Sequence, residues 1–403
     1  MQDFVLRQKA YLCRMDSGRS IYTIQFWLLC ASNFLFTASF NMMIPELPGY
    51  LSALGGREYV GLVISLFTLT AGISRPFSGK LTDTIGRVPI MAFGSLVCFV
   101  CGLLYPFMAS IYGFLLLRLF HGFSTGFKPT ATSAYVADVV PEDRRGEALS
   151  VIGISASIGM SAGPPLGSWL VSWSSVNTMF YVSSAFALLS ILILMNLKET
   201  LVHRERFSPR LLLIKKNEVF EPKVLAPAIV MLLVSYATGI ILTIGPDLCT
   251  AVGIANKGTF FMTYTLSSLL IRLVAGRASD KFGRVAVLRA SIAIQVVAMF
   301  GLAFSTDAWT VLAMAFLFGI PWGMNSPALQ AWTVDLSDPL YRGRAVATTY
   351  IALEVGIGLG AFTSGWLHNH LRNSYQINFL LCSLITFAAW VYVRMRKSPA
   401  MNY

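Results

Sequence analysis

The sequence is short of charge. Only 12% of its 403 residues are Asp, Glu, Lys or Arg, which is about half the share found in an average soluble domain, whereas 55% are hydrophobic. This shortage excludes an ordinary water-soluble protein. Apolar runs such as residues 180–195 and 225–242 recur along the whole chain, and a helix needs about 20 largely apolar residues to span a bilayer. The composition therefore predicts a protein that crosses a membrane many times.

Cysteine and histidine are also scarce, with six and four copies respectively. Most of the cysteines fall inside apolar runs, so no disulfide framework is indicated. His368 and His370 lack the further ligands that a metal site needs, and we interpret both as interfacial. The sequence has no phosphate-cradling glycine loop and no nucleophile grouped with an oriented base. We therefore expect no enzyme activity, no cofactor, no metal and no nucleic-acid partner.

Apolar windows bounded by glycine, proline or charge predict an all-α membrane protein with twelve transmembrane helices. We expect the helices to start near residues 24, 59, 88, 111, 147, 177, 225, 259, 285, 309, 345 and 374. They form two six-helix bundles, residues 21–196 and 224–396, with cytoplasmic segments at residues 1–20, 197–223 and 397–403. We interpret the middle segment as a solvated linker rather than as a regulatory or lipid-binding element.

The basic residues are distributed unevenly among the connecting segments. If both termini are cytoplasmic, the cytoplasmic segments hold 24 of the 31 Lys and Arg residues, and the outer loops hold only Arg57, Lys257 and Arg372. Cytoplasmic loops of membrane proteins carry an excess of Lys and Arg. This asymmetry predicts that both termini and the linker are cytoplasmic, and it is more informative than the net charge of +12.

An internal repeat relates the two predicted bundles. At a constant offset of 197 residues, matching residues recur over about 95 positions. The matched pairs include Arg75 with Arg272, Gly79 with Gly276, Asp83 with Asp280, Arg87 with Arg284, Asp138 with Asp335, Gly159 with Gly356 and Trp169 with Trp366. Two six-helix repeats in parallel orientation are typical of transporters whose binding site lies between the halves, near the bilayer midplane.

Three short motifs resemble the signatures of one known family, the major facilitator superfamily. Residues 79–87 (GKLTDTIGR) and 276–284 (GRASDKFGR) are similar to its loop signature between helices 2 and 3. Residues 118–122 (RLFHG) resemble its helix 4 signature, with His where the family usually has Gln. Residues 159–167 resemble its antiporter-associated helix 5 signature, with Ser168 replacing the last Gly. The resemblance implies a twelve-helix transporter like the proton-driven drug and metabolite exporters.

Each copy of the loop signature is surrounded by charges. Its glycines allow a sharp turn between two helices, and its aspartate can face helix N-termini. Arg75 and Arg272 lie just inside the membrane and are costly there unless they snorkel or pair with acids such as Asp138 and Asp335. The resemblance implies that these charges hold the cytoplasmic side shut in the outward-open state, and the alternative is a purely structural and topological role. The predicted cytoplasmic gate consists of Asp83, Arg87, Arg75 and Asp138, with their repeat partners Asp280, Arg284, Arg272 and Asp335.

Predicted helix 5 carries small residues at a spacing of four, namely Gly159, Gly163 and Gly167. Small residues on one stripe allow close approach of helices in lipid, so packing alone explains them. Packing does not explain why Pro164 occurs in this half while the repeat has Ala361 at the matching position. A proline bend in one half only is able to bias how the halves rock, and the resemblance links this feature to export.

Predicted helix 4 carries the most polar stripe of the chain. Its members recur at intervals of three and four residues and so share one face: Arg118, His121, Thr125, Lys128, Thr132 and Tyr135. We expect this face to bind substrate. Lys128 lies about 15 Å along the helix from Asp138, near the midplane, where an ionisable group is a functional candidate. We predict that Lys128 contacts an anionic group of the substrate; the alternative is a fixed bridge to an acidic partner.

Glu354 is the only acid well inside a predicted span. A buried carboxyl whose surroundings alternate between wet and dry can gain and lose a proton near neutral pH. We therefore predict that Glu354 couples transport to protons, with Glu46 as the next candidate. Glu46 and Asp247 both adjoin a proline at the outer end of a predicted helix, where they act either as gate acids or as interfacial charges.

These observations predict a secondary active transporter that moves a small organic solute by alternating access, most readily as proton-coupled efflux. The alternatives are a proton-linked or facilitative importer of an anionic metabolite and, less favoured, a membrane-embedded enzyme. Cations on predicted helix 4 favour an anionic or zwitterionic substrate, and an aromatic content of 13% can accommodate an apolar body. We expect a functional monomer in a cell membrane, with substrate, protons and the lipid bilayer as its partners, and a bacterial inner membrane as its location.

Overall fold

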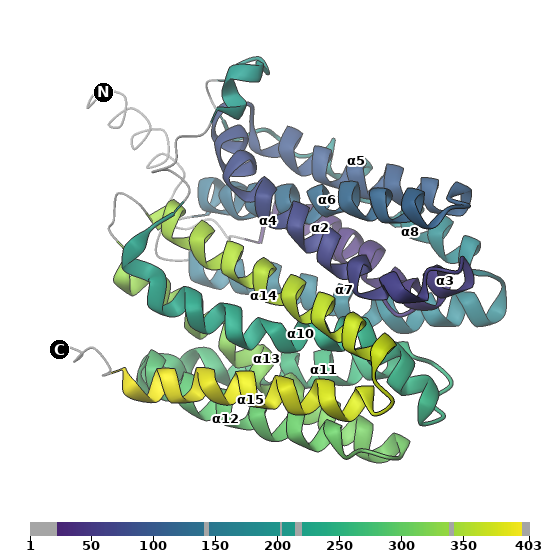
Figure 1. Cartoon of the computed structure of the whole chain (residues 1–403). Coiled ribbons are helices and arrows are strands. Elements are labelled where there is room, and N and C mark those ends of the chain that lie inside the picture. Colours follow the sequence, from purple (N-terminus) through teal and green to yellow (C-terminus); the bar gives the residue numbers. More distant parts are fainter. Residues whose placement is uncertain (1–21, 141–144, 202–203, 214–219, 338–341, 397–403) are drawn as a thin grey trace.

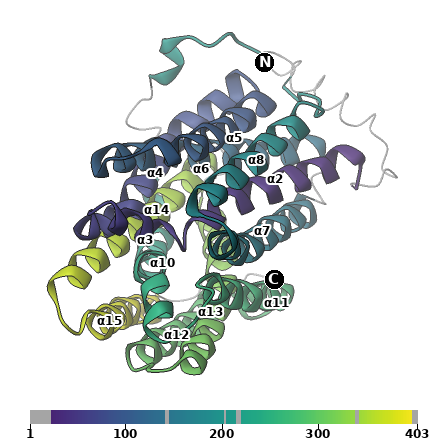
Figure 2. The ribbon, with the colours of Figure 1, turned by 90° about the vertical axis from the view of Figure 1, so that its right-hand side faces the viewer.

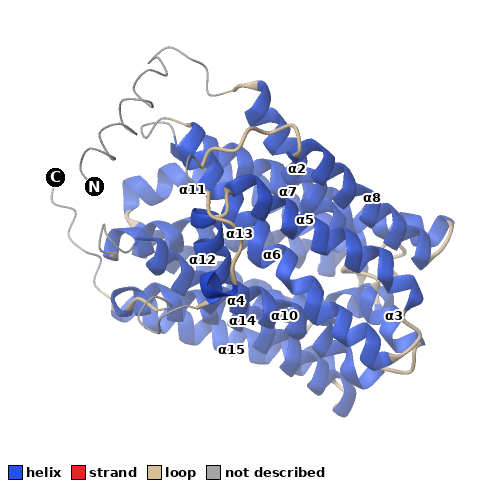
Figure 3. Cartoon of the chain, turned by 90° about the horizontal axis from the view of Figure 1, so that it is seen from above, coloured by secondary structure: helices blue, strands red, loops and turns tan. Residues whose placement is uncertain are grey.

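The computed structural model describes residues 22–140, 145–201, 204–213, 220–337 and 342–396. All regular structure in these ranges is helical (Figure 3). The long helices are α2 (Ile24–Met43), α4 (Val60–Thr84), α5 (Arg87–Leu104), α6 (Ile111–Val139), α7 (Arg145–Trp173), α8 (Val176–Leu194), α10 (Leu225–Ala251), α11 (Gly258–Phe282), α12 (Arg284–Ala303), α13 (Ala308–Leu336), α14 (Arg342–His370) and α15 (Ser374–Met395). Shorter elements include α3 (Leu47–Ala53) and the 3₁₀ turn η1 (Arg57–Tyr59).

The twelve long helices confirm the expected number, and each starts within three residues of its predicted position. Within the described ranges, ten helices are long and apolar enough to cross a membrane. The other two long helices are α6, which carries Arg118 and Lys128, and α11, which carries Arg272. Local signals explain the helix starts: Thr23, Ser110 and Ser175 each accept a backbone N–H in the first turn of the helix that follows.

The helices form two groups that lie side by side (Figures 1 and 2). In the N-terminal half, α2 packs against α7 and α8, and α6 packs against α4 and α5. In the C-terminal half, α10 packs against α14 and α15, and α13 packs against α11 and α12. Each half has a buried apolar cluster of its own, as expected for two repeats that fold around separate interiors. A further cluster joins the halves, because it includes Ile357 and Ala361 of α14 among residues of the N-terminal half.

Two helix pairs make most of the contact between the halves: α4 packs against α14, and α7 packs against α11. The α4–α14 contact is closest at Gly61 and Gly365, because a Cβ at Gly365 would lie 2.4 Å from the Gly61 Cα. Below, the "linker end" is the end of the bundle at which α4 turns into α5 and α8 leads into the linker. The "opposite end" is where α3 and η1 lie (Figure 1).

In the loop signature, only the glycine at the C-terminal end of the motif forms the predicted turn. Gly86 and the repeat-related Gly283 adopt φ values of +136° and +84°, a backbone conformation that favours glycine. Gly79 is different, because it lies inside α4 and a Cβ added there would meet no atom within 4 Å. The expectation that both glycines of the signature form the turn is therefore wrong for Gly79.

The first part of the linker packs on the N-terminal half. The Glu199 carboxylate accepts the backbone N–H groups of Arg87 (3.0 Å) and Val88 (2.9 Å) at the start of α5, where a negative charge also favours the helix dipole. The Glu205 N–H donates to the Thr84 carbonyl (2.8 Å). The described N-terminal part of the linker is therefore held against the N-terminal half by hydrogen bonds, although most of residues 204–213 are exposed to solvent.

Candidate functional site

An ion pair connects the two halves near the middle of the bundle. Arg75 on α4 donates through Nη2 to Oε1 of Glu354 on α14 across 3.1 Å, and the side chains are only 10% and 8% exposed. A Cβ at Gly72, one turn earlier on α4, would lie 3.3 Å from the Glu354 Cβ. The absence of a side chain at Gly72 therefore lets α14 bring its acid against α4. The expected partner of Arg75 was Asp138, and the structure corrects this to Glu354.

Polar and aromatic groups from three helices, α6, α13 and α14, surround this pair. The Arg75 guanidinium lies over the Tyr350 ring, with Cζ 4.8 Å from the ring centroid, and approaches Thr130 Oγ1 on α6. The Tyr350 hydroxyl accepts a hydrogen bond from Gln330 Nε2 on α13 (3.0 Å). Sequence reasoning missed Thr130, Gln330 and Tyr350. The available signal was the position of Tyr350, which lies one helical turn from Glu354.

Arg272 on α11 is the repeat partner of Arg75, and it lies at the other junction of the halves. Its Nη1 would lie 3.9 Å from a Cβ added to Gly153 on α7. Its Nε is buried and has no hydrogen-bond partner among the described residues. Arg272 also lies within electrostatic range of the Tyr350 hydroxyl. Its expected partner was Asp335, which instead pairs with Arg284.

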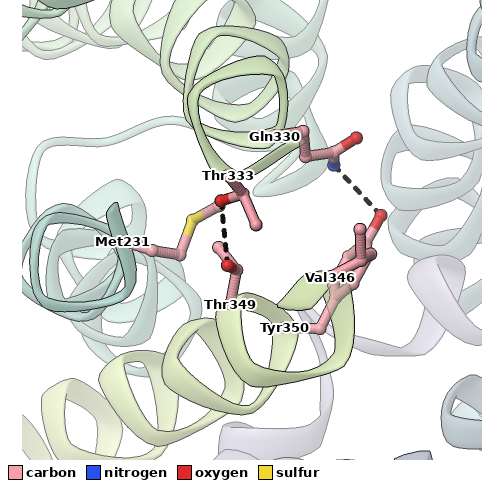
Figure 4. A pocket seen from close by; sticks show the side chains of 6 residues that line it. All are labelled: Met231, Gln330, Thr333, Val346, Thr349 and Tyr350. Carbon is pink, nitrogen blue, oxygen red and sulfur yellow. Dashed lines mark hydrogen bonds between the residues drawn. The ribbon is translucent and has the colours of Figure 1, made fainter. Parts of the chain in front are cut away.

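A small pocket adjoins the same cluster on the side of the C-terminal half (Figure 4). Helices α10, α13 and α14 contribute its lining, which consists of Met231, Gln330, Thr333, Val346, Thr349 and Tyr350. Thr333 and Thr349 are hydrogen-bonded to each other (2.9 Å), and Gln330 is bonded to Tyr350. The Tyr350 ring therefore lies between this pocket and the Arg75–Glu354 pair.

The polar stripe of α6 faces the interior of the N-terminal half, not the C-terminal half. Arg118 Nε donates to the Val63 carbonyl (2.9 Å), and the guanidinium covers the Phe67 ring. The buried His121 ring contacts the Tyr105 hydroxyl (3.1 Å) and the thiol of Cys98 (3.3 Å). All of these partners belong to α4, α5 or the turn after α5. The expectation that Arg118 and His121 face a central substrate cavity is therefore corrected.

Lys128 is fully buried in the same half. Its Nζ donates to Ser32 Oγ (2.9 Å) and to Ser95 Oγ (3.0 Å), and it also contacts the hydroxyl of Ser190. The ring of Phe36 lies 4.6 Å from the ammonium nitrogen. No carboxylate contacts this nitrogen among the described residues. Among the described residues Lys128 therefore has no acidic partner, and its ammonium group lies inside the N-terminal half instead of between the halves.

The remaining members of the stripe also make contacts within the half. The hydroxyls of Thr125 and Thr132 donate to carbonyls of their own helix, and the Tyr135 hydroxyl donates to Gln25 Oε1 (3.1 Å). In the C-terminal half, the repeat partner of Lys128 is Asn325, whose Nδ2 donates to Gln295 Oε1 (2.9 Å). The two halves thus fill the same internal position with a cation and with a neutral amide.

Apart from Arg75 and Arg272, the predicted gate charges whose side chains are described form one cluster in each half. Arg87 pairs with Asp83 (2.9 Å) and with Asp138 (3.0 Å) within the N-terminal half. Asp138 also accepts a hydrogen bond from Thr200 of the linker (2.6 Å). In the C-terminal half, Arg284 pairs with Asp335 (3.3 Å). The side chain of Asp280 lies outside the described residues.

At the opposite end, polar groups cross between the halves. Lys257 Nζ lies 3.4 Å from Oε2 of Glu46, whose Oε1 accepts a hydrogen bond from Ser168 (2.7 Å). Asn256 Nδ2 donates to the carbonyl of Pro165 (3.2 Å). These contacts tie the loop before α11 to α7 and to the start of α3.

His368 lies 3.7 Å from Asp247, and no group of His, Cys, Asp and Glu that could hold a metal occurs in the described ranges.

The glycine stripe of α7 packs against α2. A Cβ added at Gly159, Gly163 or Gly167 would lie 2.7, 2.8 or 1.9 Å from a carbonyl oxygen of that helix. Close packing thus accounts for all three glycines. Pro164 and Pro165 lie inside α7, and their backbone atoms lie 2.3–2.4 Å from a Cβ that would be added at Gly258 of α11. The proline pair therefore lies at the junction of the halves.

Comparisons with known proteins agree with this architecture. The family model described as Major Facilitator Superfamily matches residues 29–255 and 228–402. Multidrug resistance protein MdtG of Citrobacter koseri is 28% identical over 356 residues, which cover 82% of this chain and 84% of that protein. MdtG of Dickeya zeae is 26% identical over 411 residues, covering 95% of this chain and 96% of that protein.

Solved structures share the fold at low sequence identity. The human organic anion transporter MFSD10 (TETRAN) has a TM-score of 0.72 at 18% identity, covering 91% of this chain and 98% of that chain. A D-xylose–proton symporter has a TM-score of 0.75 at 16% identity, covering 94% and 98%. With the family model matching nearly the whole chain, this multi-pass membrane protein belongs to the major facilitator superfamily of small-molecule transporters.

Proposed function

We propose that the chain exports small organic molecules in exchange for protons. The observation that carries the proposal is the buried ion pair between Arg75 and Glu354, because it joins the two halves through a group that protonation neutralises. Similarity to proteins named multidrug resistance protein supports export. Import is the second candidate, since a D-xylose–proton symporter shares the fold.

The proposed cycle is alternating access between the halves. The positive-inside distribution of Lys and Arg supports assigning the linker end, with both termini, to the cytoplasm of a bacterial cell. On that assignment the contacts of Lys257 with Glu46 and of Asn256 with Pro165 close the outer side. The chain then has the arrangement of an inward-facing state, in which substrate enters from the cytoplasm. We expect it to work as a monomer.

Glu354 is the proposed proton-coupling residue. While Glu354 is ionised, it compensates the charge of Arg75, and the pair holds α4 against α14. A proton that binds to the carboxylate removes one charge of the pair and weakens the attachment between the halves. Movement of the halves then exposes the carboxyl to the other side, where it releases the proton. Glu46 is the second candidate, because it also lies at a junction of the halves.

The loop-signature charges are the proposed cytoplasmic gate. Asp83, Arg87 and Asp138 form a preassembled cluster at the linker end of the N-terminal half, and Arg284 with Asp335 forms its counterpart. Closure of that end would bring the two clusters toward each other, with Asp280 as a further expected member. The Pro164–Pro165 pair at the junction with α11 is the proposed pivot during this movement.

Transport by purified protein tests the proposal. Proteoliposomes with an acidic lumen should accumulate substrate while protons leave the lumen down the imposed pH gradient, and should do so only when the protein is present. A panel of fluorescent organic dyes, accumulated by cells with and without the gene, reports direction. Lower dye accumulation in cells that produce the protein supports export, whereas higher accumulation supports the importer.

A further inference from the structure

The internal repeat breaks its symmetry at the two junctions between the halves. Arg75 and Arg272 occupy matching positions, on α4 and α11. At the first junction, α14 supplies Glu354, which pairs with Arg75. At the second junction, the residue that matches Glu354 at the offset of 197 is Ser157 on α7. Arg75 therefore has a carboxylate opposite it, whereas Arg272 faces α7, which has Ser157 at the position that matches Glu354.

Arg272 is left as an uncompensated cation among the described residues. Its Nε is buried without a hydrogen-bond partner, as is the Nε of Arg75. Across the junction, a Cβ added to Gly153 would lie 3.9 Å from Arg272 Nη1, and Gly153 has no side chain that could compensate the charge. Arg284, one helix further on, already takes the nearby Asp335. A guanidinium in the membrane interior without a counter-charge is costly, so its retention calls for an anion that is present during the cycle.

Neutral groups beside Arg272 fit the remaining part of such a site. The Tyr350 hydroxyl lies within electrostatic range of Arg272. It accepts a hydrogen bond from Gln330, and its own hydrogen has no acceptor among the described residues. A phenolic hydroxyl that is already polarised as an acceptor is a good donor to an anion.

We propose that Arg272 binds the carboxylate of an organic monoanion, with Tyr350 as an additional hydrogen-bond donor. This rests on the proposed transport function and specifies its substrate class. The planar guanidinium matches a carboxylate through two parallel hydrogen bonds. Glu354 neutralises Arg75, so among the described arginines of the two junctions Arg272 alone has no carboxylate partner, and its single positive charge selects one negative charge. The ligand occupies the position that Glu354 holds at the other junction.

Binding to purified protein in detergent tests the inference. The probes are benzoate, salicylate and indole-3-acetate, each compared with its primary amide, and the readouts are the dissociation constant and the melting temperature. Wild-type protein should bind at least one carboxylate tenfold or more tightly than its amide. Arg272→Gln should remove this preference and leave amide binding unchanged. Arg57→Gln, which removes an exposed cation at the opposite end, is the matched control and should keep the preference.

A second variant tests the same idea without removing the arginine. Ser157→Glu gives the second junction a carboxylate at the position that matches Glu354 in the first junction. The new carboxylate should occupy Arg272, weaken carboxylate binding at least tenfold and raise the melting temperature. This outcome separates loss of the site from a failure to fold.

Two results overturn the inference: equal carboxylate binding in wild type and Arg272→Gln, or wild-type protein that prefers amides throughout the panel. Either result leaves the proposed function intact if proton-linked transport of another solute is still measured. Loss of all proton-linked transport by the wild type refutes the proposed function instead.

Discussion

Arg75 and Glu354 are 279 residues apart in the chain, yet their side chains meet across 3.1 Å at the junction of the two halves. The two residues come from different repeats, and each is nearly buried. A buried ion pair contributes little net stability, but the removal of one partner strands the other. The pair is therefore a contact whose strength depends on protonation, located where the halves must separate.

The first prediction concerns coupling. Glu354→Gln keeps the size of the side chain and imitates the protonated acid. In proteoliposomes we expect this variant to lose accumulation driven by a pH gradient while it still exchanges substrate at equal pH. Glu58→Gln, on the exposed turn η1, is the control and should behave as wild type. An unchanged response of Glu354→Gln to the gradient would move the coupling role to Glu46.

A second prediction concerns stability. Arg75→Gln and Glu354→Ala each leave a buried charge without its partner, which costs about 3–5 kcal/mol in typical buried pairs. Both single variants should therefore melt at lower temperature than wild type. The double variant Arg75→Gln/Glu354→Ala removes both charges and should recover much of the loss. Thermal unfolding in detergent measures all four proteins, and strictly additive losses would mean that the two side chains do not interact.

The helices could be predicted from the sequence because their signals are local. A run of apolar residues, a capping residue such as Ser110 and a turn glycine such as Gly86 act on their own segment. The internal repeat made the division into two halves predictable, because two segments that match at a constant offset are expected to form the same structure. Helix starts were therefore accurate to within three residues.

The direction in which a polar face points could not be predicted in this way. The spacing of Arg118, His121 and Lys128 correctly places them on one face of α6, but it does not say which neighbours that face meets. Serine hydroxyls from α2, α5 and α8 accept hydrogen bonds from Lys128. Serine is common in the sequence, so the sequence alone does not show which serines contact Lys128. The pairing of Arg75 with Glu354 likewise depends on how the halves pack.

The third prediction follows from the serine environment of Lys128. Because no carboxylate contacts its ammonium group among the described residues, Lys128→Met strands no buried acid, and Ser32 and Ser190 remain hydrogen-bonded to each other (2.8 Å). We expect a melting temperature within a few degrees of wild type and unchanged affinity for organic carboxylates. Arg272→Gln, measured in the same assay, should lose that affinity. A tenfold loss in Lys128→Met would instead restore the substrate role that the sequence favoured.

A fourth prediction concerns orientation. Single cysteines at Ser208, in the described part of the linker, and at Ser175, before α8, lie at opposite ends of the bundle. In a cysteine-free background, an impermeant thiol reagent added to intact cells should label only the cysteine at position 175. Permeabilised cells are the control, since both sites should then react. Labelling of position 208 in intact cells would reverse the proposed orientation.

The last prediction compares two glycines of the same helix. A Cβ at Gly61 would lie 2.6 Å from the carbonyl oxygen of Ala361 on α14, whereas a Cβ at Gly79 would meet nothing within 4 Å. Gly61→Ala should therefore force α4 and α14 apart at the opposite end and favour the state that is open there. Gly79→Ala introduces a better helix former without a clash, which stabilises a helix by up to about 1 kcal/mol.

A cysteine in place of Asn256, whose side chain contacts Pro165, reports on this movement through its rate of labelling by an impermeant thiol reagent. The rate should rise several-fold in Gly61→Ala and stay at the wild-type value in Gly79→Ala, whose melting temperature should not fall. Equal labelling in both variants would show that the close approach of Gly61 to α14 does not keep the opposite end closed. A lower melting temperature in Gly79→Ala would show that the sequence was right to assign Gly79 a conformational role.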